Sequence, residues 1–407
     1  MYRVAVISVH TSPMASPGGH KAGGMNVYVR ELAREMGGRG YAVDVFTRRD
    51  GDMPQVVEMG GGVRVVHLEA GGESLANPEE AYLFLPRFLR SLLCFQEAAG
   101  LQYHLVHSHY WLSGWVGQML ARRWRAPHVT MFHTLGEAKN QARISERESP
   151  RRIKAEHRVA QTADRIVCAS RDERNLLVRL YGVPAGCIRV VPCGVDLDLF
   201  RPMDKGEARR RLRLDDAPII LYVGRLEPLK GIDILLRAVA QLSDDVPFRL
   251  LIVGGDERST GERRQLEGLA REIGIAERVL FAGAVDHHQL PLYYNAADVC
   301  AVPSYYESFG LVAVEAMACG TPVVATRVGG LAGTVRDGET GYLIPWRCPE
   351  PFADKLETLL INDELRQRLG QAARAAVEPY RWHSVADQVE AIYQELLAAP
   401  EEACCNP

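Results

Sequence analysis

Two carboxylates flank a glycine at the start of a helix that the sequence predicts to be buried. Glu307 precedes Gly310 and Glu315 follows it in the run P-S-Y-Y-E-S-F-G-L-V-A-V-E-A-M-A-C-G. Residues 311–318 are apolar on every face except at Glu315, which is typical of a buried helix, and a buried carboxylate needs a partner. Free N–H groups at the helix start suit a diphosphate, and carboxylates suit sugar and ribose hydroxyls. The pattern favours a nucleotide-sugar site; the alternative is that Glu307 only complements the helix dipole and Glu315 pairs with an arginine in the core.

Two further segments have the chemistry of phosphate binding. Gly23 and Gly24 end a long loop after the first apolar run, and Asn26 follows them. Paired glycines before a helix let backbone N–H groups approach a phosphate, although the G-x-G-x-x-G spacing of dinucleotide sites is missing. Arg225 and Lys230 stand between another apolar run and the next helix, where two cations would stabilise the charge of a leaving diphosphate. The alternative for both cations is plain exposure to solvent.

Histidines and hydroxyl groups gather where two neighbouring strands are expected to end. The segment His107–Gly114 reads H-S-H-Y-W-L-S-G, and the segment Phe132–Leu135 reads F-H-T-L. The carboxyl ends of parallel strands are where α/β proteins bind ligands. A single histidine at a strand end is usually structural, but two adjacent strand ends that each offer a histidine and a hydroxyl predict one shared site.

The elements that must position these residues alternate between short β-rich runs and amphipathic helices, which predicts parallel sheets covered on both faces. In the first half the expected strands are Val4–Val9, Val43–Phe46, Val63–Leu68, Leu105–Ser108, His128–Phe132, Ile166–Ala169 and Ile188–Val191. In the second half they are Ile219–Val223, Arg249–Val253, Val279–Phe281, Val299–Val302, Pro322–Ala325 and Gly341–Ile344. The expected helices include Val27–Met36, Asp172–Tyr181, Ile232–Leu242, Glu262–Ile273 and Leu290–Ala297. The sequence therefore predicts an α/β protein with two sheet domains.

Length and composition agree with this organisation. A chain of 407 residues is long for a single core, and its net charge of −3 argues against a nucleic-acid partner. Four cysteines lie in apolar segments and are expected to be core residues in a reducing compartment; they are Cys94, Cys168, Cys300 and Cys319. No apolar run approaches the ~20 residues of a transmembrane helix, so we expect a cytoplasmic protein. A homodimer is left open.

The run S-Y-Y-E-S-F-G-L-V-A-V-E-A-M-A-C-G-T-P-V-V-A resembles, almost letter for letter, the signature of retaining family-4 glycosyltransferases with the GT-B fold. The resemblance covers nearly the whole chain. The loop ending in G-G-M-N-V-Y looks like that of mycothiol-pathway enzymes that glycosylate inositol phosphate, whereas sucrose-phosphate synthases tend to carry a shorter G-G-Q version. The resemblance implies two Rossmann-like domains with the active site in the cleft between them. It assigns residues 1–198 to acceptor binding and residues 203–380 to the nucleotide sugar, with a last helix at about 382–400 that crosses back onto the first domain.

The implied reaction moves a hexose or N-acetylhexosamine from a UDP-sugar to a phosphorylated polyol or sugar such as inositol phosphate. An alternative is the transfer of glucose to fructose 6-phosphate, as in sucrose-phosphate synthases. A nucleotide-sugar 2-epimerase is an alternative of another class, which would share the architecture but consume no acceptor.

The resemblance also assigns roles to individual residues. As catalytic residues it implies His133 on the donor sugar, Arg225 and Lys230 on the diphosphate, and Glu307 on the sugar and phosphate. For the donor it implies Gly23, Gly24, Asn26, Val285 on the base, Ser308, Phe309, Gly310, Leu311, and Glu315 on the ribose. For the acceptor it implies Tyr110, Thr134 and Arg152, with Arg152 on the acceptor phosphate. The alternative for Arg152 is a helix pair with Glu156, four residues later.

The mechanism implied is front-side displacement, because family comparison places no carboxylate of these motifs as a nucleophile. In that route the acceptor hydroxyl attacks on the side from which the diphosphate leaves, and a phosphate oxygen takes its proton. Metal-ligand spacing is absent, so we expect no required cofactor and no metal site, with Mg²⁺ at most accessory.

One departure from the family pattern concerns the acceptor. The inositol-phosphate enzymes carry a lysine in the segment that matches Leu75–Glu80, and this chain has none there. The candidates to replace it as a phosphate ligand are Lys21, Arg87 and Arg90.

Overall fold

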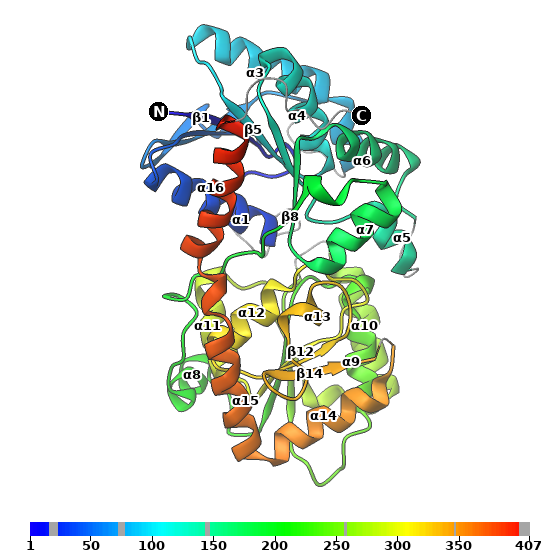
Figure 1. Cartoon of the computed structure of the whole chain (residues 1–407). Helices are drawn as coiled ribbons and strands as arrows, with labels where there is room; N and C mark the ends of the chain where they lie inside the picture. Colours follow the sequence, from blue (N-terminus) through cyan, green and yellow to red (C-terminus); the bar gives the residue numbers. More distant parts are fainter. Residues whose placement is uncertain (16–22, 72–77, 143–146, 256–258, 346, 399–407) are drawn as a thin grey trace.

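The computed structural model describes residues 1–15, 23–71, 78–142, 147–255, 259–345 and 347–398. Lys21 and residues 75–77 of the Leu75–Glu80 segment lie outside the described residues. The described chain forms two α/β domains, each built around its own sheet (Figure 1).

The first sheet has eight strands in the order β3-β4-β2-β1-β5-β6-β7-β8. Its strands are β1 (Arg3–Ile7), β2 (Ala42–Arg48), β3 (Val56–Gly60), β4 (Val63–Leu68), β5 (Leu105–His109), β6 (His128–Met131), β7 (Arg165–Cys168) and β8 (Ile188–Val190). All neighbours pair in parallel except β3, which runs antiparallel to β4 at the sheet edge. The helices of this domain are α1 (Gly24–Gly38), α2 (Pro78–Leu83), α3 (Leu85–Ala98), α4 (Trp111–Trp124), α5 (Gly136–Ala142), α6 (Pro150–Thr162) and α7 (Arg171–Tyr181).

The second sheet has six parallel strands in the order β11-β10-β9-β12-β13-β14. They are β9 (Ile219–Val223), β10 (Arg249–Val253), β11 (Val279–Gly283), β12 (Val299–Val302), β13 (Val323–Thr326) and β14 (Gly341–Ile344). The helices around it are α8 (Lys205–Leu212), α9 (Ile232–Val239), α10 (Thr260–Glu272), α11 (Leu290–Ala296), α12 (Leu311–Ala318), α13 (Leu331–Thr334), α14 (Pro349–Ile361) and α15 (Asp363–Ala376).

Both sheets reverse their strand order beside the first strand of the domain, between β1 and β5 and between β9 and β12. Such switch points are where open α/β sheets bind ligands, in the crevice outside the carboxyl ends of the strands. The loops after these four strands therefore form the frame of the candidate site.

The last helix, α16 (Trp382–Ala398), lies against α1 of the first domain although it follows α15 of the second (Figure 1). Arg39 at the end of α1 forms ion pairs with Asp387 at 2.6 Å and Glu390 at 2.8 Å. The hydroxyl of Tyr393 lies 2.6 Å from Nδ1 of His107 in β5. Helix α16 thus packs on the first domain; the exact domain limits stay a prediction.

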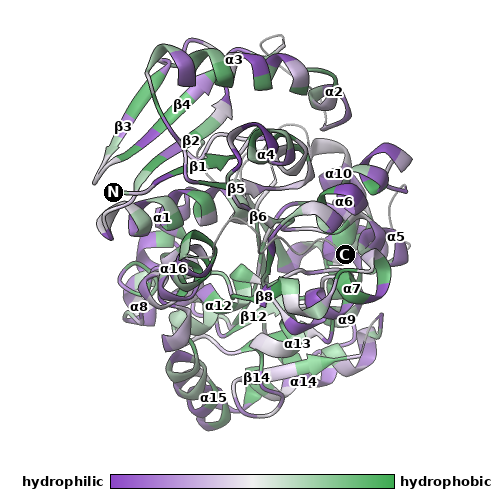
Figure 2. Cartoon of the chain, turned by 45° about the horizontal axis from the view of Figure 1, so that its top comes forward, coloured by the Kyte–Doolittle hydropathy of each residue, from purple (hydrophilic) through white to green (hydrophobic). Residues whose placement is uncertain are grey.

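The hydrophobic cores lie between the sheets and their helices, and the outer helices such as α3 and α6 carry hydrophilic residues beside hydrophobic ones (Figure 2). Every strand expected from the sequence is present, and no strand end differs by more than two residues from the expected one. Strand β3 was not expected, because its residues are exposed or half-buried and include a glutamate. Cys168, Cys300 and Cys319 are buried as predicted, but the prediction for Cys94 was wrong: it is exposed on α3, since only one stripe of that helix faces the core.

Candidate active site

Two residues at neighbouring strand ends adopt a left-handed backbone conformation. Tyr110 after β5 has φ +76°, and His133 after β6 has φ +61°. This region is uncommon for residues with a side chain, and such strain is kept where the surrounding structure fixes it, often at functional sites. The N–H of Tyr110 donates to the carbonyl of Met131 at 2.8 Å, which ties the two strand ends together. The two segments that were predicted to share a site therefore lie side by side at the carboxyl ends of β5 and β6.

His133 belongs to a row of buried imidazoles. Its Nε2 lies 3.0 Å from Nδ1 of His109, and the ring of His109 lies 4.3 Å from that of His107. Burial lowers the pKa of His133 to about 3, and burial followed by the charges of the other histidines lowers the pKa of His107 to about 3. The imidazole of His133 is therefore neutral at neutral pH and offers hydrogen bonds rather than positive charge.

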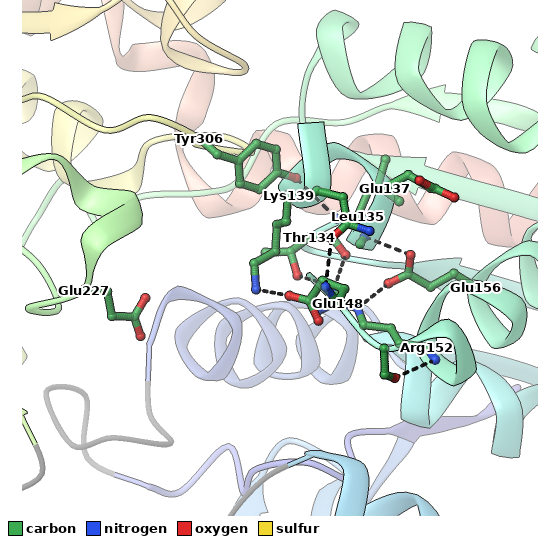
Figure 3. A network of polar contacts seen from close by, with 12 residues as sticks. Thr134, Leu135, Glu137, Lys139, Glu148, Arg152, Glu156, Glu227 and Tyr306 are labelled. Carbon is green, nitrogen blue, oxygen red and sulfur yellow. Dashed lines mark hydrogen bonds and ion pairs between the residues drawn. The ribbon is translucent and has the colours of Figure 1, made fainter. Parts of the chain in front are cut away.

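Arg152, near the start of α6, is held by a closed network of polar contacts (Figure 3). Its Nε donates to Glu156 at 2.7 Å, its Nη1 pairs with Glu148 at 3.0 Å, and its Nη2 donates to both the carbonyl and the hydroxyl of Thr134 at 3.0 Å. The guanidinium also lies over the ring of Tyr110, 5.2 Å from its centre. Of the three predicted acceptor ligands, Arg152 thus contacts both of the others.

The helix pair that was the alternative for Arg152 also exists. The side chain of Glu156 is fully buried, and it accepts from the N–H of Gly136 at 2.9 Å and from the hydroxyl of Tyr181 at 2.6 Å as well as from Arg152. Burial by itself would lower the pKa of Arg152, but Tyr110, Glu156 and Glu148 raise it, and the net pKa lies above its ordinary value. Arg152 is therefore a permanent cation. Its guanidinium binds the buried Glu156 on one edge and faces Thr134 and Tyr110 on the other.

The glycine loop of the first domain lies beside the second domain. A side chain at Gly24 would begin 2.5 Å from Cδ1 of Leu311, so glycine allows the start of α1 to approach the start of α12. Asn26 is buried and donates to the hydroxyl of Thr11 at 2.7 Å and the carbonyl of Ser12 at 2.6 Å, while its Oδ1 accepts from the N–H of Gly23. Asn26 therefore holds the loop through Gly23, and Gly24 is the residue at which the loop meets the second domain.

In the second domain, Lys230 and Glu307 form an ion pair at 2.6 Å. Their loops are brought together at the switch point, because a side chain at Gly231 would meet the carbonyl oxygen of Pro303 at 2.1 Å. Arg225, after β9, pairs with Glu227 at 2.6 Å, and its side chain is 55% exposed. Both predicted diphosphate ligands therefore lie at the carboxyl end of the sheet, and each forms an ion pair with a glutamate side chain.

The segment after Glu307 packs against Gly329 and Gly330, and a side chain at Gly329 would meet the carbonyl oxygen of Glu307 at 1.8 Å. The N–H of Gly330 donates to the carbonyl of Glu307 at 3.0 Å, and a side chain at Gly330 would meet Cα of Phe309 at 2.4 Å. Phe309 is buried, Ser308 and Leu311 are half-buried, and Gly310 has φ +94° as the residue before α12. These contacts fix the backbone of residues 307–310 at the N-terminal end of α12.

Glu315 is buried within α12, and the partner that its burial requires is not an arginine. Its Oε1 lies 2.9 Å from Nε2 of His287, and its Oε2 accepts from the hydroxyl of Tyr294 at 2.8 Å. Burial alone would lower the pKa of His287, but the hydrogen bond to Glu315 and its charge raise it above the ordinary value. Val285, two residues before His287, is half-buried against the same core. Both hydrogen-bond partners of Glu315 thus come from the segment that follows Val285.

The two halves of the candidate site touch across the domain junction. The hydroxyl of Tyr306, from the loop after β12, accepts from the N–H of Leu135 after β6 at 3.2 Å (Figure 3). Together with the approach of Gly24 to Leu311, this contact places the strand ends of one sheet opposite those of the other. The predicted acceptor ligands and the donor ligands Gly24 and His133 of the first domain therefore face the donor ligands of the second domain across one junction.

Of the candidates for the missing lysine, Arg87 and Arg90 are exposed on α3 rather than placed beside the buried Arg152. Sequence reasoning missed two neighbours of Arg152, namely Glu148 and Lys139, which form an ion pair with each other. Glu148 stands four residues before Arg152, which is a helix-pair spacing that could have been recognised. Lys139 lies on another helix, and its position in the sequence did not indicate the contact.

Within the described ranges, no group of three His, Cys, Asp or Glu residues is placed to hold a metal ion, and no helix is long and apolar enough to cross a membrane.

Two Rossmann-like domains whose strand ends face each other define the GT-B class of glycosyltransferases. Family models bear this out: one described as "Glycosyltransferase Family 4" matches residues 22–199, and one described as "Glycosyl transferases group 1" matches residues 204–376. The D-inositol 3-phosphate glycosyltransferase of Geodermatophilus obscurus is 44% identical, over 98% of this chain and 92% of its own. That of Acidothermus cellulolyticus is 43% identical, over 97% of this chain and 91% of its own. The chain belongs to this glycosyltransferase family and is a hexosyltransferase.

Solved structures agree with the fold. A sucrose-phosphate synthase from Thermosynechococcus elongatus superposes with a TM-score of 0.91 at 39% identity, covering 98% of this chain and all of that one (100%). An Anabaena protein solved with UDP-glucose has a TM-score of 0.78 at 20% identity, covering 97% of this chain, which shows a shared fold.

Proposed function

We propose that this hexosyltransferase moves a hexose or N-acetylhexosamine from a UDP-sugar to a phosphorylated polyol, with D-inositol 3-phosphate as the first candidate. The observation that carries the proposal is the contact of Arg152 with Thr134 and Tyr110, opposite the Lys230–Glu307 pair. A permanent cation beside a hydroxyl and a phenol is suited to a phosphate. The names of the relatives at 43% and 44% identity support the same acceptor.

The mechanism we propose is front-side displacement with retention of configuration. Arg225 and Lys230 exchange their resident carboxylates for the donor diphosphate and stabilise the charge that develops as it leaves. Glu307, the backbone amides of residues 309 and 310, and neutral His133 orient the sugar, while Glu315 takes the ribose. The acceptor hydroxyl attacks from the side of the leaving diphosphate, and a phosphate oxygen receives its proton. The protein contributes orientation and charge rather than a nucleophile.

In this proposal two protein cations neutralise the leaving group, so no metal ion is required. We expect full activity in excess EDTA. A loss of activity that Mg²⁺ restores would contradict leaving-group stabilisation by Arg225 and Lys230 alone.

A second candidate acceptor is fructose 6-phosphate. It is favoured by the similarity to the sucrose-phosphate synthase structure at 39% identity over nearly the whole chain. The two acceptors share a phosphate on a small polyhydroxylated ring, so the contacts of Arg152 support both.

The test is a matrix of donors and acceptors with the purified protein. UDP-glucose and UDP-N-acetylglucosamine are each incubated with D-inositol 3-phosphate, fructose 6-phosphate and the two unphosphorylated compounds, and UDP release and product configuration are measured. We expect UDP release that depends on a phosphorylated acceptor, and a product that keeps the donor configuration. Equal rates with unphosphorylated acceptors would contradict the acceptor class, and conversion of the donor without any acceptor would indicate an epimerase.

A further inference from the structure

The guanidinium of Arg152 has one edge that the fold does not use. Nε is bound to the fully buried Glu156, and Nη2 is bound to the carbonyl and hydroxyl of Thr134. Only Nη1 is bound to a group outside the domain core, the carboxylate of Glu148. An acceptor phosphate that approaches Arg152 must therefore use the edge at which Glu148 lies.

Glu148 binds a second cation at the same time. Its Oε1 pairs with Nζ of Lys139 on α5, and its Oε2 pairs with Arg152 (Figure 3). The side chain of Glu148 is 19% exposed and that of Lys139 is 24% exposed, so both border solvent, in contrast to Glu156. One carboxylate thus lies between two cations, which is the arrangement that an oxyanion ligand would adopt there.

We propose that Glu148 occupies the acceptor-phosphate position between Arg152 and Lys139, and that the acceptor phosphate binds by displacing it. The inference rests on the proposed function for the nature of the ligand. A phosphate dianion carries more charge than a carboxylate and binds the same donors, so it competes for both cations. At this position between the two cations, Lys139 replaces the lysine that the Leu75–Glu80 segment lacks.

The displacement has a simple route in the described structure. The N–H of Glu148 donates to Oδ1 of Asn140 at 2.8 Å, and the hydroxyl of Ser149 accepts from the N–H of Arg152 at 3.1 Å. These contacts hold the backbone at the start of α6 and involve no atom of the Glu148 side chain, so the carboxylate can leave its two cations without moving the backbone. Specificity follows, because an unphosphorylated acceptor has no anion with which to replace the carboxylate.

The direct test measures binding of inorganic phosphate by calorimetry to the wild-type protein and to Glu148→Gln. We expect the variant to bind phosphate about tenfold more tightly, since the competing charge is gone. Glu137→Gln is the matched control, because Glu137 lies on the same helix as Lys139 and removes the same charge without contacting Arg152. Equal or weaker phosphate binding by Glu148→Gln, with a normal melting temperature, would overturn the proposal, and so would an equal gain in the control.

A second variant tests the role of Lys139. Adding Lys139→Met to Glu148→Gln should return phosphate affinity to the wild-type level or below, and an unchanged affinity would remove Lys139 from the pocket. With the phosphorylated acceptor that the wild type uses, Glu148→Gln should lower KM several-fold and leave donor affinity unchanged. If the wild type uses no phosphorylated acceptor, the proposed function fails. If it does use one and Glu148→Gln changes neither KM nor phosphate affinity, the function stands and this inference fails.

Discussion

The two sides of the domain junction hold their cations in opposite ways. On the first-domain side, the Arg152 side chain is 4% exposed and its partner Glu156 is fully buried. On the second-domain side, Lys230 is 22% exposed and Arg225 is 55% exposed, and each pairs with one partly exposed carboxylate. The cation of the first domain is thus enclosed together with its carboxylate, whereas the two cations of the second domain stay near solvent.

The difference follows from the elements that carry the charges. Arg152 and Glu156 lie on one face of α6, which packs against α4, so their charges are enclosed by the domain and must satisfy each other. Arg225 and Lys230 lie between β9 and α9, in the segment that follows the carboxyl end of β9 at the domain junction. A surface pair of that kind contributes about 0–1 kcal/mol, so its cation can change partner at little cost.

Arg152→Ala should have the largest effect, and the effect should be on folding as well as catalysis. The change leaves Glu156 charged, buried and short of one donor, which costs about 3–5 kcal/mol. Calorimetric melting should show a large loss of stability, and Arg152→Lys should recover only part of it, because an ammonium cannot reproduce the fork of contacts. Adding Glu156→Gln to Arg152→Ala should restore some stability by removing the unpaired charge. If Arg152→Ala has a normal melting temperature and a normal KM for the acceptor, Arg152 is needed neither for folding nor for acceptor binding.

Lys230→Met should show the reverse pattern. If the ammonium stabilises the leaving diphosphate, kcat should fall by about 10²–10³ while the melting temperature hardly changes. Lys205→Met is a suitable control, because Lys205 pairs with the buried Asp298, which precedes β12 and binds the N–H of Ile219 at the start of β9, at the opposite end of these strands from the junction loops. We expect that control to lose stability and keep kcat. A Lys230→Met enzyme with wild-type kcat would remove Lys230 from the catalytic residues.

The sequence contained enough information for the fold and for the grouping of the predicted acceptor ligands. Tyr110 and Thr134 follow adjacent parallel strands, so strand prediction alone brings them together, and the helix after the next loop brings Arg152. It did not contain the pairing of Glu148 with Lys139, because that contact depends on how α5 and the start of α6 lie relative to each other rather than on periodicity. Nor did it predict β3, since an edge strand with half-exposed residues has no continuous apolar run.

Glu173 provides a pH test of the idea that carboxylates of the first domain serve its interior. Its Oε2 accepts from the N–H of Ala169 at 2.9 Å, and its Oε1 is buried without a hydrogen-bond partner in the described part of the chain. Burial raises the pKa of Glu173 to about 7. The unfolded value is about 4.3, so the folded state binds more protons between these values and stability falls as pH rises from about 4.3 to about 7.

The size of that pH effect follows from the shift in pKa. It amounts to roughly 3.5 kcal/mol, and Glu173→Gln should remove it, so the variant should gain stability relative to the wild type as pH rises. Denaturant unfolding of both proteins at pH 4.5, 6 and 7.5 measures this. Stability curves that stay parallel across the range would show that Glu173 has an ordinary pKa.

Glu315→Gln should have the smallest effect and tests whether a carboxylate of the second domain is also enclosed. Both of its oxygens are occupied, by His287 and Tyr294, which is the arrangement of a core carboxylate. A carboxylate can accept further hydrogen bonds, however, and losing a charge-assisted contact to the ribose costs about 1.5 kcal/mol or more, which is about tenfold in donor affinity. Because the ribose is held alike in the ground state and the transition state, kcat at saturating donor should stay near the wild-type value.

Calorimetry with UDP measures the affinity of Glu315→Gln for the nucleotide, and thermal melting measures its stability. Weaker UDP binding with little loss of stability would place Glu315 with Lys230 and Arg225. Unchanged UDP binding together with a lower melting temperature would instead place it with Glu156, and the second domain would then carry an enclosed carboxylate of its own.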